Sequence, residues 1–326
     1  MPETRTAAGP DAEFQALVRA KYAGDPGAMT ALGARLVVGN EAPFSPVDGA
    51  ALIAEAASQG DAGAWSYVAV LAAAGVGRAQ SWPDAYVALQ RAGELRDAQA
   101  VKQLGLLGEI GIGSAPDAQR WIAGAGREAL RDSPRLQACR GFLTSALCTY
   151  VIERARPKLQ QAKVFDANSG TLRVDAMRSN TGAVFSLIET DFIIQLVRAR
   201  IAHAASVAAD ALEPAEVLHY SIGEAYRPHV DFFHPQLPNF AEQMRVKGQR
   251  IKTCLVYLND DFDAGETEFP KLAFKFRGAA GDALIFENVK ANGAGDLSTL
   301  HAGLPPTRGE KWLFSQWIRS KAQPVA

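Results

Sequence analysis

The sequence has few cysteines, no long apolar run and almost no net charge, and each of these features excludes a class of protein. Its 326 residues include only three cysteines, an odd number without a CxxC pair: Cys139, Cys148 and Cys254. A disulfide framework is therefore not expected, and a reducing cytoplasm is the predicted location. The N-terminal stretch MPETRTAAGPDAEF has no basic segment followed by an apolar one, so no secretory signal is expected.

The charge balance argues against nucleic-acid and membrane partners. A formal net charge of −1, with 21% charged residues, gives no electrostatic reason to bind nucleic acid or an anionic membrane surface. No run of about 18 apolar residues is present, so no membrane span is expected. The hydrophobic content of 48% is ordinary for a globular protein, and the length predicts two domains.

The first predicted domain, residues 1–130, contains an internal repeat of 36 residues, the spacing from Asp25 to Asp61 and from Asp61 to Asp97. The other aligned columns are Leu17, Ile53 and Leu89; Ala20, Ala56 and Ala92; Ala28, Ala64 and Ala100; Leu32, Val68 and Leu104; and Gly39 with Gly75. Small and apolar residues at this period predict stacked helical hairpins in which each aspartate caps a helix. An alanine-rich helical bundle with chance periodicity is the alternative.

A short phrase within the repeats carries a first resemblance. Residues 56–64, AASQGDAGA, are similar to the Sel-one-like class of tetratricopeptide-type repeats. The resemblance implies an all-α solenoid. Solenoids present concave surfaces to peptides or proteins, so a protein partner of the repeats is expected.

The second predicted domain, residues 131–326, changes to strand patterns. Residues from about 134 to 165 are predicted to be a connecting helical region, and 184–208 a long helix. From residue 217 onward, short β-branched segments bounded by turns predict strands: VLHYSI, KTCLVYL, AFKF, DALIF and KWLFSQWI. The predicted class is therefore α+β, a helical solenoid followed by a sandwich or jelly roll that is flanked by helices, with a core over about residues 215–320.

A His-x-Asp pair and a distant histidine form the candidate metal site. His229 and Asp231 are two positions apart, so in extended backbone both side chains project from one face. With His301, two imidazoles and one carboxylate suit iron(II) and leave other coordination positions open, whereas thiolates favour zinc. A surface turn is the alternative for an isolated His-x-Asp. A zinc hydrolase is also disfavoured, because no HExxH-type helix supplies a general base.

Lys311 follows His301 by ten residues and begins the apolar stretch KWLFSQWI. On a strand that faces the same cavity, its ammonium is placed to pair with the distal carboxylate of 2-oxoglutarate. A solvated surface lysine is the alternative. His234 is expected to be a loop histidine near the pocket mouth rather than a ligand.

Four ordered motifs from Val217 to Arg319 carry a second resemblance: VLHYSIGEAYRPHVDFF, GQRIKTCLVYLNDDFDAGETEFPKL, GDALIFEN and STLHAGLPPTRGEKWLFSQWIR. They resemble the prolyl 4-hydroxylase branch of the iron(II)/2-oxoglutarate-dependent dioxygenases. The resemblance implies a double-stranded β-helix fold, Fe(2+), and 2-oxoglutarate and O2 as co-substrates, and it is compatible with ascorbate as a further cofactor. The implied reaction hydroxylates a prolyl residue of a peptide or protein and releases succinate and CO2.

The resemblance also implies roles for individual residues. The iron ligands match His229, Asp231 and His301. The co-substrate residues match Lys311 for the C5 carboxylate, Tyr220 beside it, and Thr253 as a hydrogen-bond donor. The substrate-handling positions match Tyr226, Arg250 and Trp317. The residues alone leave other roles open. Tyr220 and Trp317 could be ordinary core aromatics, and Arg250 could be a surface charge.

The sequence departs from the family pattern on the substrate side. One glycine, not a pair, precedes Gln249 and Arg250, and Arg319 stands where some peptide-acting relatives have a histidine. Other targets are therefore kept as alternatives: another residue type, a free amino acid or a small molecule. An inactive interaction scaffold is a further alternative, and the intact metal and lysine positions argue against it.

Overall fold

The computed structural model describes residues 12–166 and 169–323, which form two compact units. Within the described residues, the first unit comprises 12–123 and 185–199, and the second comprises the remainder. The division at Ala123 and Gly124 falls earlier than the boundary predicted near residue 130. Most of the N-terminal stretch for which no secretory signal is expected lies outside the described residues. No helix in the described ranges is long and apolar enough to cross a bilayer.

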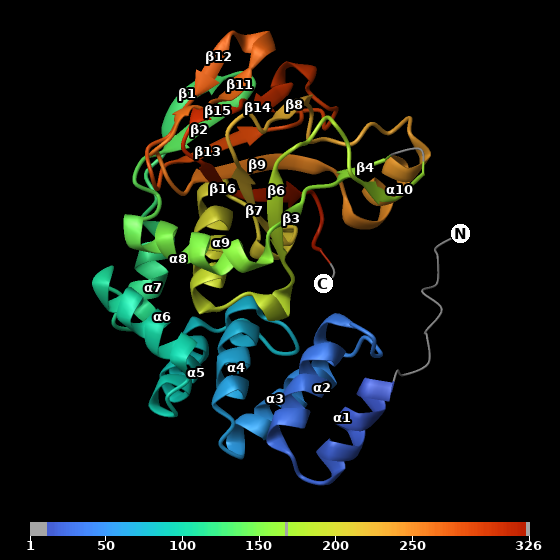
Figure 1. Cartoon of the computed structure of the whole chain (residues 1–326), viewed down its shortest axis with the longest axis vertical. Helices are drawn as coiled ribbons and strands as arrows, with labels where there is room; N and C mark the ends of the chain where they lie inside the picture. The colour runs from blue at the N-terminus through green and yellow to red at the C-terminus, as the bar shows by residue number, and fades with distance from the viewer. Residues whose placement is uncertain (1–11, 167–168, 324–326) are drawn as a thin grey trace. The chain divides into compact units, whose positions relative to one another are not determined.

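The first unit consists of helical hairpins. Its helices are α1 (Ala12–Tyr22), α2 (Pro26–Val38), α3 (Pro46–Ser58), α4 (Ala62–Ala74), α5 (Trp82–Glu94), α6 (Ala98–Glu109) and α7 (Ala115–Ala123). Figure 1 shows α1 to α6 following one another side by side, in colours from blue to cyan. The predicted all-α repeat region is therefore confirmed.

The aspartates that recur every 36 residues cap helices, as the sequence predicts. Asp25, Asp61 and Asp97 accept backbone N–H bonds from residues three positions later, at 3.2, 3.1 and 2.7 Å. The glycine column ends the helices, because Gly39 and Gly75 adopt left-handed backbone with φ of 67° and 70°. The period of 36 residues therefore marks the second helix of each hairpin.

A second hydrogen bond ties each repeat to the next. The Thr30 hydroxyl donates to Asp61 at 2.8 Å, and the Ser66 hydroxyl donates to Asp97 at 3.3 Å. Thr30 and Ser66 are themselves one period apart. Each of these aspartates thus caps its own helix and also binds the preceding repeat.

Residues 185–199 belong with the first unit because of helix α9 (Phe192–Ala205). The Phe192 ring meets those of Trp82 and Tyr86 edge-on, with centroids 5.6 and 6.2 Å away. The Gln103 side chain accepts the backbone N–H of Ile193 at 3.4 Å. A segment from the middle of the chain therefore completes the helical unit.

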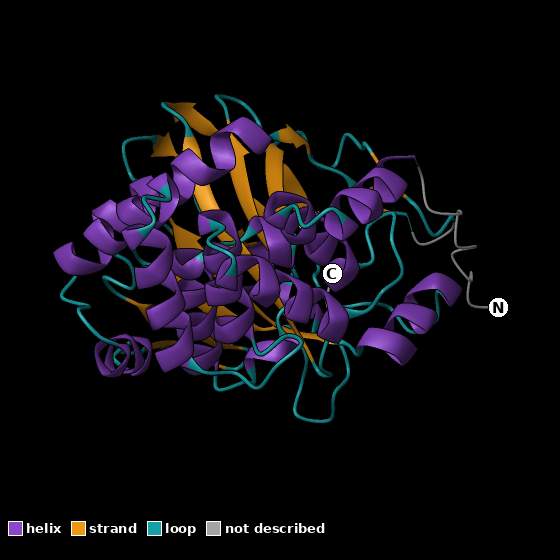
Figure 2. Ribbon diagram, turned by 90° about the horizontal axis from the view of Figure 1, so that it is seen from below, coloured by secondary structure: helices purple, strands orange, loops and turns teal. Residues whose placement is uncertain are grey.

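The second unit contains two antiparallel sheets, drawn in orange in Figure 2. The main sheet has the order β1 (Glu128–Asp132), β2 (Arg135–Cys139), β13 (Ala283–Glu287), β9 (Arg250–Tyr257), β16 (Lys311–Arg319), β7 (Ala215–Tyr220), β6 (Thr181–Phe185) and β3 (Gln160–Gln161). The smaller sheet has the order β12 (Phe274–Phe276), β11 (Thr267–Phe269), β14 (His301–Gly303) and β8 (Tyr226–His229). Two sheets with an apolar layer between them are the predicted jelly-roll architecture.

Short elements surround these sheets. Two two-stranded ladders join β10 (Asp263–Ala264) to β15 (Pro306–Arg308) and β4 (Val164–Phe165) to β5 (Leu172–Arg173). The helices are α8 (Ser145–Ala155), α10 (Pro238–Lys247) and the end of α9. The 3₁₀ turns are Arg156–Lys158, Leu187–Glu189, Ala209–Ala211, Pro270–Leu272 and Leu297–Thr299.

Strand β16 is the centre of the main sheet. It lies between β9 and β7, and almost every side chain along it is buried. Its alternate residues from Leu313 to Trp317 line a pocket between the sheets. Because side chains alternate along a strand, Lys311 points from the same face as Leu313.

Two sequence predictions need correction. The region from about 134 to 165 is not only helical, because β2 pairs with β13 in the main sheet and its alternating Leu136 and Ala138 are buried. The helix predicted over 184–208 is α9 alone. Before α9, Val184 is exposed between buried Ala183 and Phe185, which is the alternation of a strand. Because all three residues are apolar, the sequence does not show this alternation.

Candidate metal centre and its pocket

The three predicted metal ligands come together from two strands and a loop. His229 ends β8, Asp231 follows two residues later, and His301 begins β14. Strands β8 and β14 are antiparallel neighbours, with His301 directly opposite His229. Cross-strand pairing therefore places the two imidazoles on one face although 72 residues separate them (301 − 229).

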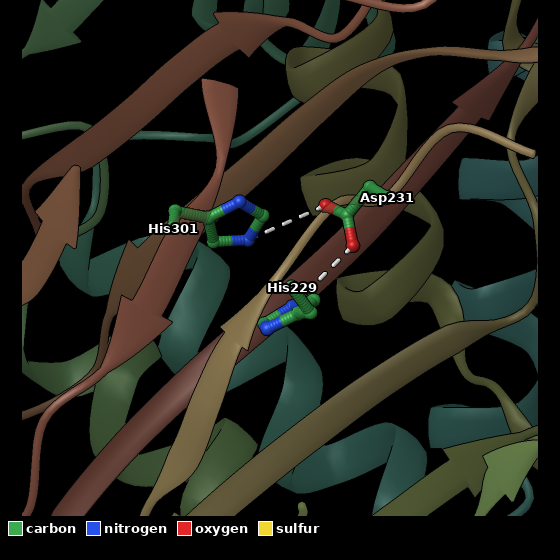
Figure 3. A group of neighbouring side chains, drawn as sticks. All are labelled: His229, Asp231 and His301. Atoms are coloured by element: carbon green, nitrogen blue, oxygen red, sulfur yellow. Dashed lines mark ion pairs between the residues drawn. The ribbon is translucent and has the colours of Figure 1, made fainter. Parts of the chain in front are cut away.

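The ring nitrogens of both histidines are oriented for a ligand (Figure 3). Nδ1 of His229 lies 2.8 Å from the carbonyl oxygen of Arg227, and Nδ1 of His301 lies 2.9 Å from that of Thr299. Each Nδ1–H donates to its carbonyl, which leaves the Nε2 lone pair for a metal. The Nε2 atoms are 3.7 and 3.6 Å from the Asp231 carboxylate, and one ligand atom from each residue lies within 4.8 Å of the others.

The electrostatics of the group suit a cation. Burial, and then the neighbouring His301, lower the pKa of His229 to about 3, so its imidazole is neutral at physiological pH. Burial alone raises the pKa of Asp231, but His301, His229 and the Thr253 hydroxyl bring it below its usual value. Two imidazoles and one carboxylate are a donor set that iron(II) accepts.

Asp231 is held from behind by a chain of side-chain hydrogen bonds. Thr253 Oγ1 donates to Asp231 Oδ2 at 2.6 Å and accepts from Asn288 Nδ2 at 2.9 Å. A threonine hydroxyl has one proton, so in this arrangement Thr253 has none left for a co-substrate. The structure therefore gives Thr253 a different partner from the one that the sequence predicts.

Lys311 is a buried basic residue close to the site. Its side chain is fully buried, and among the described residues its Nζ has no hydrogen-bond partner. Burial lowers the pKa of Lys311 from 10.5 to about 7, although Glu266 acts in the opposite direction. An unpartnered buried ammonium is the group that a ligand carboxylate satisfies, so the residues present fit 2-oxoglutarate.

Tyr220 contacts Lys311 and lines the pocket. It faces Lys311 across the β7–β16 ladder, and its ring lies 5.0 Å from the ammonium. A Cβ at Gly303 would stand 3.1 Å from the Tyr220 hydroxyl, a close approach that glycine permits. Tyr220 therefore lines the pocket beside the predicted co-substrate residue, rather than serving only as core.

Tyr226 lies against the first metal-ligand candidate, His229. Its ring stacks on His229 with centroids 3.5 Å apart, and the Arg178 guanidinium lies 5.0 Å from the ring. Burial raises the pKa of Tyr226 to about 12, so its phenol stays protonated. Arg178 is itself buried and forms an ion pair with Glu216 at 2.7 Å. Both Tyr226 and Arg178 line the pocket.

Arg250 and Trp317 lie together beside the same pocket. Trp317 lines the pocket, and the Arg250 guanidinium lies 3.7 Å from its ring centroid. Arg250 also makes two hydrogen bonds to the Glu213 carboxylate, at 2.7 and 2.9 Å. Arg319, where some relatives have a histidine, binds the same carboxylate. Arg250 is therefore fixed in an ion-pair cluster rather than extended as a free surface charge.

Sequence reasoning missed several residues that shape the site: Arg178, Glu216, Glu213 and Asn288. Asn288 ends the quoted motif GDALIFEN, but a buried amide has no distinctive spacing. Arg178 reaches the pocket through an isolated β-bridge to Tyr226. No local pattern predicts such a bridge. His234, by contrast, lies outside the metal group and packs against Phe232, as expected of a loop histidine.

Fold and site together define a jelly-roll protein with a His-x-Asp…His metal centre and a buried lysine next to Tyr220, which lines the pocket. Residues 215–319 match the model of the 2OG-Fe(II) oxygenase superfamily. Prolyl 4-hydroxylase 1 of Arabidopsis thaliana is 32% identical over 232 residues, which cover 63% of this chain and 80% of that protein. The chain therefore belongs to the prolyl 4-hydroxylase family of this superfamily.

Two further comparisons define the extent of the likeness. Probable prolyl 4-hydroxylase 7 of Arabidopsis thaliana is 31% identical over 208 residues, 58% of this chain; the match spans 64% of that relative, just under two thirds. A viral collagen prolyl hydroxylase from Paramecium Bursaria Chlorella virus-1, solved with 2OG, has a TM-score of 0.45 and 24% identity. That match covers 59% of this chain and 99% of the viral one.

Proposed function

We propose that this protein is a 2-oxoglutarate-dependent dioxygenase that hydroxylates a prolyl residue within a peptide or protein. One observation carries the proposal: the Nε2 atoms of His229 and His301 converge on Asp231, and the buried Lys311 ammonium has no hydrogen-bond partner among the residues that the structure describes. A metal site alone fits many reactions. A metal site with an unpartnered ammonium nearby fits a dicarboxylate co-substrate.

The proposed roles follow from what each side chain contacts. His229, Asp231 and His301 hold iron(II), and Lys311 binds the C5 carboxylate of 2-oxoglutarate. Iron(II) with 2-oxoglutarate and O2 supplies the chemistry that oxidises an unactivated C–H bond, with succinate and CO2 as co-products. The surrounding aromatic and aliphatic side chains exclude water, and Tyr220 supplies a neutral phenol beside the ammonium.

A peptide substrate is supported by the residues beside the pocket. Trp317 and Tyr226 offer aromatic surfaces there, and Glu213 fixes the Arg250 guanidinium over the Trp317 ring. Flat aromatic surfaces suit the compact ring of proline. The named activity of the prolyl 4-hydroxylase relatives supports the same substrate class.

Two further parts of the proposal concern the whole chain. The helical repeats are proposed to bind a protein partner or the polypeptide substrate, because stacked hairpins present extended surfaces. A reducing cytoplasm remains our proposal for the location, supported by the three cysteines, all of which are buried and unpaired.

The proposal is tested with purified protein, iron(II), ascorbate, 2-oxoglutarate and O2, with proline-containing peptides compared against free proline and small acids. We expect a peptide to gain one oxygen atom by mass spectrometry, with one succinate formed per hydroxylation. Hydroxylation of free proline or of another residue type alone contradicts the prolyl-peptide assignment. Iron binding without any 2-oxoglutarate turnover on these substrates favours an interaction scaffold.

A further inference from the structure

Asn288 lies behind the metal site and does not line the pocket. It follows β13, its side chain is fully buried, and its NH2 group is linked to the metal group by a hydrogen bond to Thr253. We propose that Asn288 is a positioning residue: acting through Thr253, it fixes the orientation of the Asp231 carboxylate and so sets the affinity for a divalent metal. The inference rests on the proposed iron site and extends it.

The direction of the hydrogen bonds is fixed by chemistry. An ionised carboxylate only accepts, so the Thr253 hydroxyl must donate to Asp231 Oδ2. Having donated its single proton, Thr253 Oγ1 can only accept, and the Asn288 NH2 group supplies that bond at 2.9 Å. The hydrogen bonds are therefore donated in one direction, from the Asn288 amide to the Thr253 hydroxyl and from that hydroxyl to the Asp231 carboxylate.

The two donor residues, Asn288 and Thr253, are held in place by backbone hydrogen bonds and strand pairing. The Asn288 N–H donates to Ile251 O at 2.8 Å, and its carbonyl accepts from the Asp296 N–H at 3.0 Å. Thr253 lies within β9, where it faces Phe286 on one side and Trp317 on the other. An anchored amide and an anchored hydroxyl leave the Asp231 carboxylate one preferred rotation, whereas Asp231 itself lies in a loop after β8.

The other half of the Asn288 amide supports a specific role for the NH2 group. Asn288 Oδ1 is buried and, among the described residues, has no hydrogen-bond partner. A buried polar atom without a partner is unfavourable, so a residue chosen only for packing would not carry it. The amide is present for the bond that it donates to Thr253.

The experiment measures Mn(II) and anaerobic Fe(II) dissociation constants, with the unfolding temperature recorded for every variant. Asn288→Ala removes the donor. Asn288→Asp keeps the shape and replaces the donor with an acceptor, which draws the Thr253 proton away from Asp231. We expect both to weaken metal binding by about 10- to 100-fold. The visible spectrum of bound Co(II) is expected to change as well, because the carboxylate is reoriented.

A double-mutant cycle tests whether Asn288 acts through Thr253. We expect Thr253→Val to weaken metal binding like Asn288→Ala, the double variant to be no weaker than Thr253→Val alone, and Thr253→Ser to restore affinity. The matched control is Asn259→Ala, because Asn259 is also a hydrogen-bonded asparagine but binds Asp261 and backbone groups around Trp312. It is expected to lower the unfolding temperature without changing the metal dissociation constant.

The outcomes separate this inference from the proposed function. If the wild-type protein binds metal and the Asn288 variants bind it equally well, the positioning role is overturned but the iron site is not. The same holds if the effects of the Asn288 and Thr253 substitutions on metal affinity are additive. An equal loss of affinity in Asn259→Ala also overturns the positioning role, because general destabilisation then explains the effect. Wild-type protein that binds no divalent metal overturns the proposed iron site, and this inference with it.

Discussion

Lys311 lies directly opposite Tyr220 in the β7–β16 ladder, with its ammonium 5.0 Å from the tyrosine ring. The same ammonium lies 5.6 Å from the centroid of the Tyr257 ring. Two aromatic faces stabilise a cation without neutralising it. The Lys311 ammonium thus stays available to a ligand, and its burial lowers the stability of the protein.

Lys311→Met is predicted to stabilise the protein while it weakens co-substrate binding. Methionine fills a similar volume and removes a buried charge that has no hydrogen-bond partner among the described residues, so the free energy of unfolding is expected to rise by about 1–4 kcal/mol. The same change is expected to weaken 2-oxoglutarate binding by about 10- to 100-fold, because one charge-assisted bond is lost. Thermal unfolding with and without 2-oxoglutarate measures both effects. A destabilised variant with unchanged 2-oxoglutarate affinity contradicts this role of Lys311.

The affinity for 2-oxoglutarate is predicted to fall as the pH rises above about 7, where the buried ammonium loses its proton. Binding then requires protonation, so affinity is expected to fall by about tenfold per pH unit above the pKa. The stability of the free protein changes in the opposite direction. The unfolded chain holds this proton up to pH 10.5, so the lysine contributes a stability increase between about pH 7 and 10.5. Calorimetric titrations across this range, with Lys311→Met as the control, provide the measurement.

Trp317→Ala is predicted to affect the peptide substrate more than the co-substrate. Trp317 lines the pocket and carries the Arg250 guanidinium on its face. Loss of the indole is expected to cost about 1–2 kcal/mol of peptide binding, roughly tenfold in peptide KM. The KM for 2-oxoglutarate is expected to stay within about twofold. Equal increases in both constants would show that the tryptophan supports the pocket as a whole.

Asp61→Ala is predicted to destabilise the helical unit more than Asp25→Ala. Both variants lose a helix cap, worth about 1 kcal/mol. Asp61 also accepts the Thr30 hydroxyl of the preceding repeat, so a further 0.5–1.5 kcal/mol, roughly, is expected to be lost. Denaturant unfolding measures the difference, and Asp61→Asn serves as the control that keeps an accepting oxygen. Equal losses for Asp25→Ala and Asp61→Ala would exclude a contribution from the bond between repeats.

The predictable parts of this protein are those with a short period or a fixed spacing. The aspartate column predicts caps because a cap is a local interaction, and the His229–Asp231 spacing predicts a shared face because side chains alternate in extended backbone. Strand β2 was missed because its partner β13 lies more than 140 residues away, from Cys139 to Ala283. Asn288 was missed for the same physical reason: its partner Thr253 is reached through tertiary structure alone.

Anaerobic titration with iron(II) and 2-oxoglutarate tests the assignment of the metal and co-substrate site, because the chelated complex of this ligand set has a weak visible charge-transfer band. We expect a band that requires both additions, is lost in Asp231→Ala and His229→Ala, and needs a higher 2-oxoglutarate concentration in Lys311→Met. A band that persists in Asp231→Ala, or wild-type protein that retains no iron and shows no band, would contradict the assignment of this site.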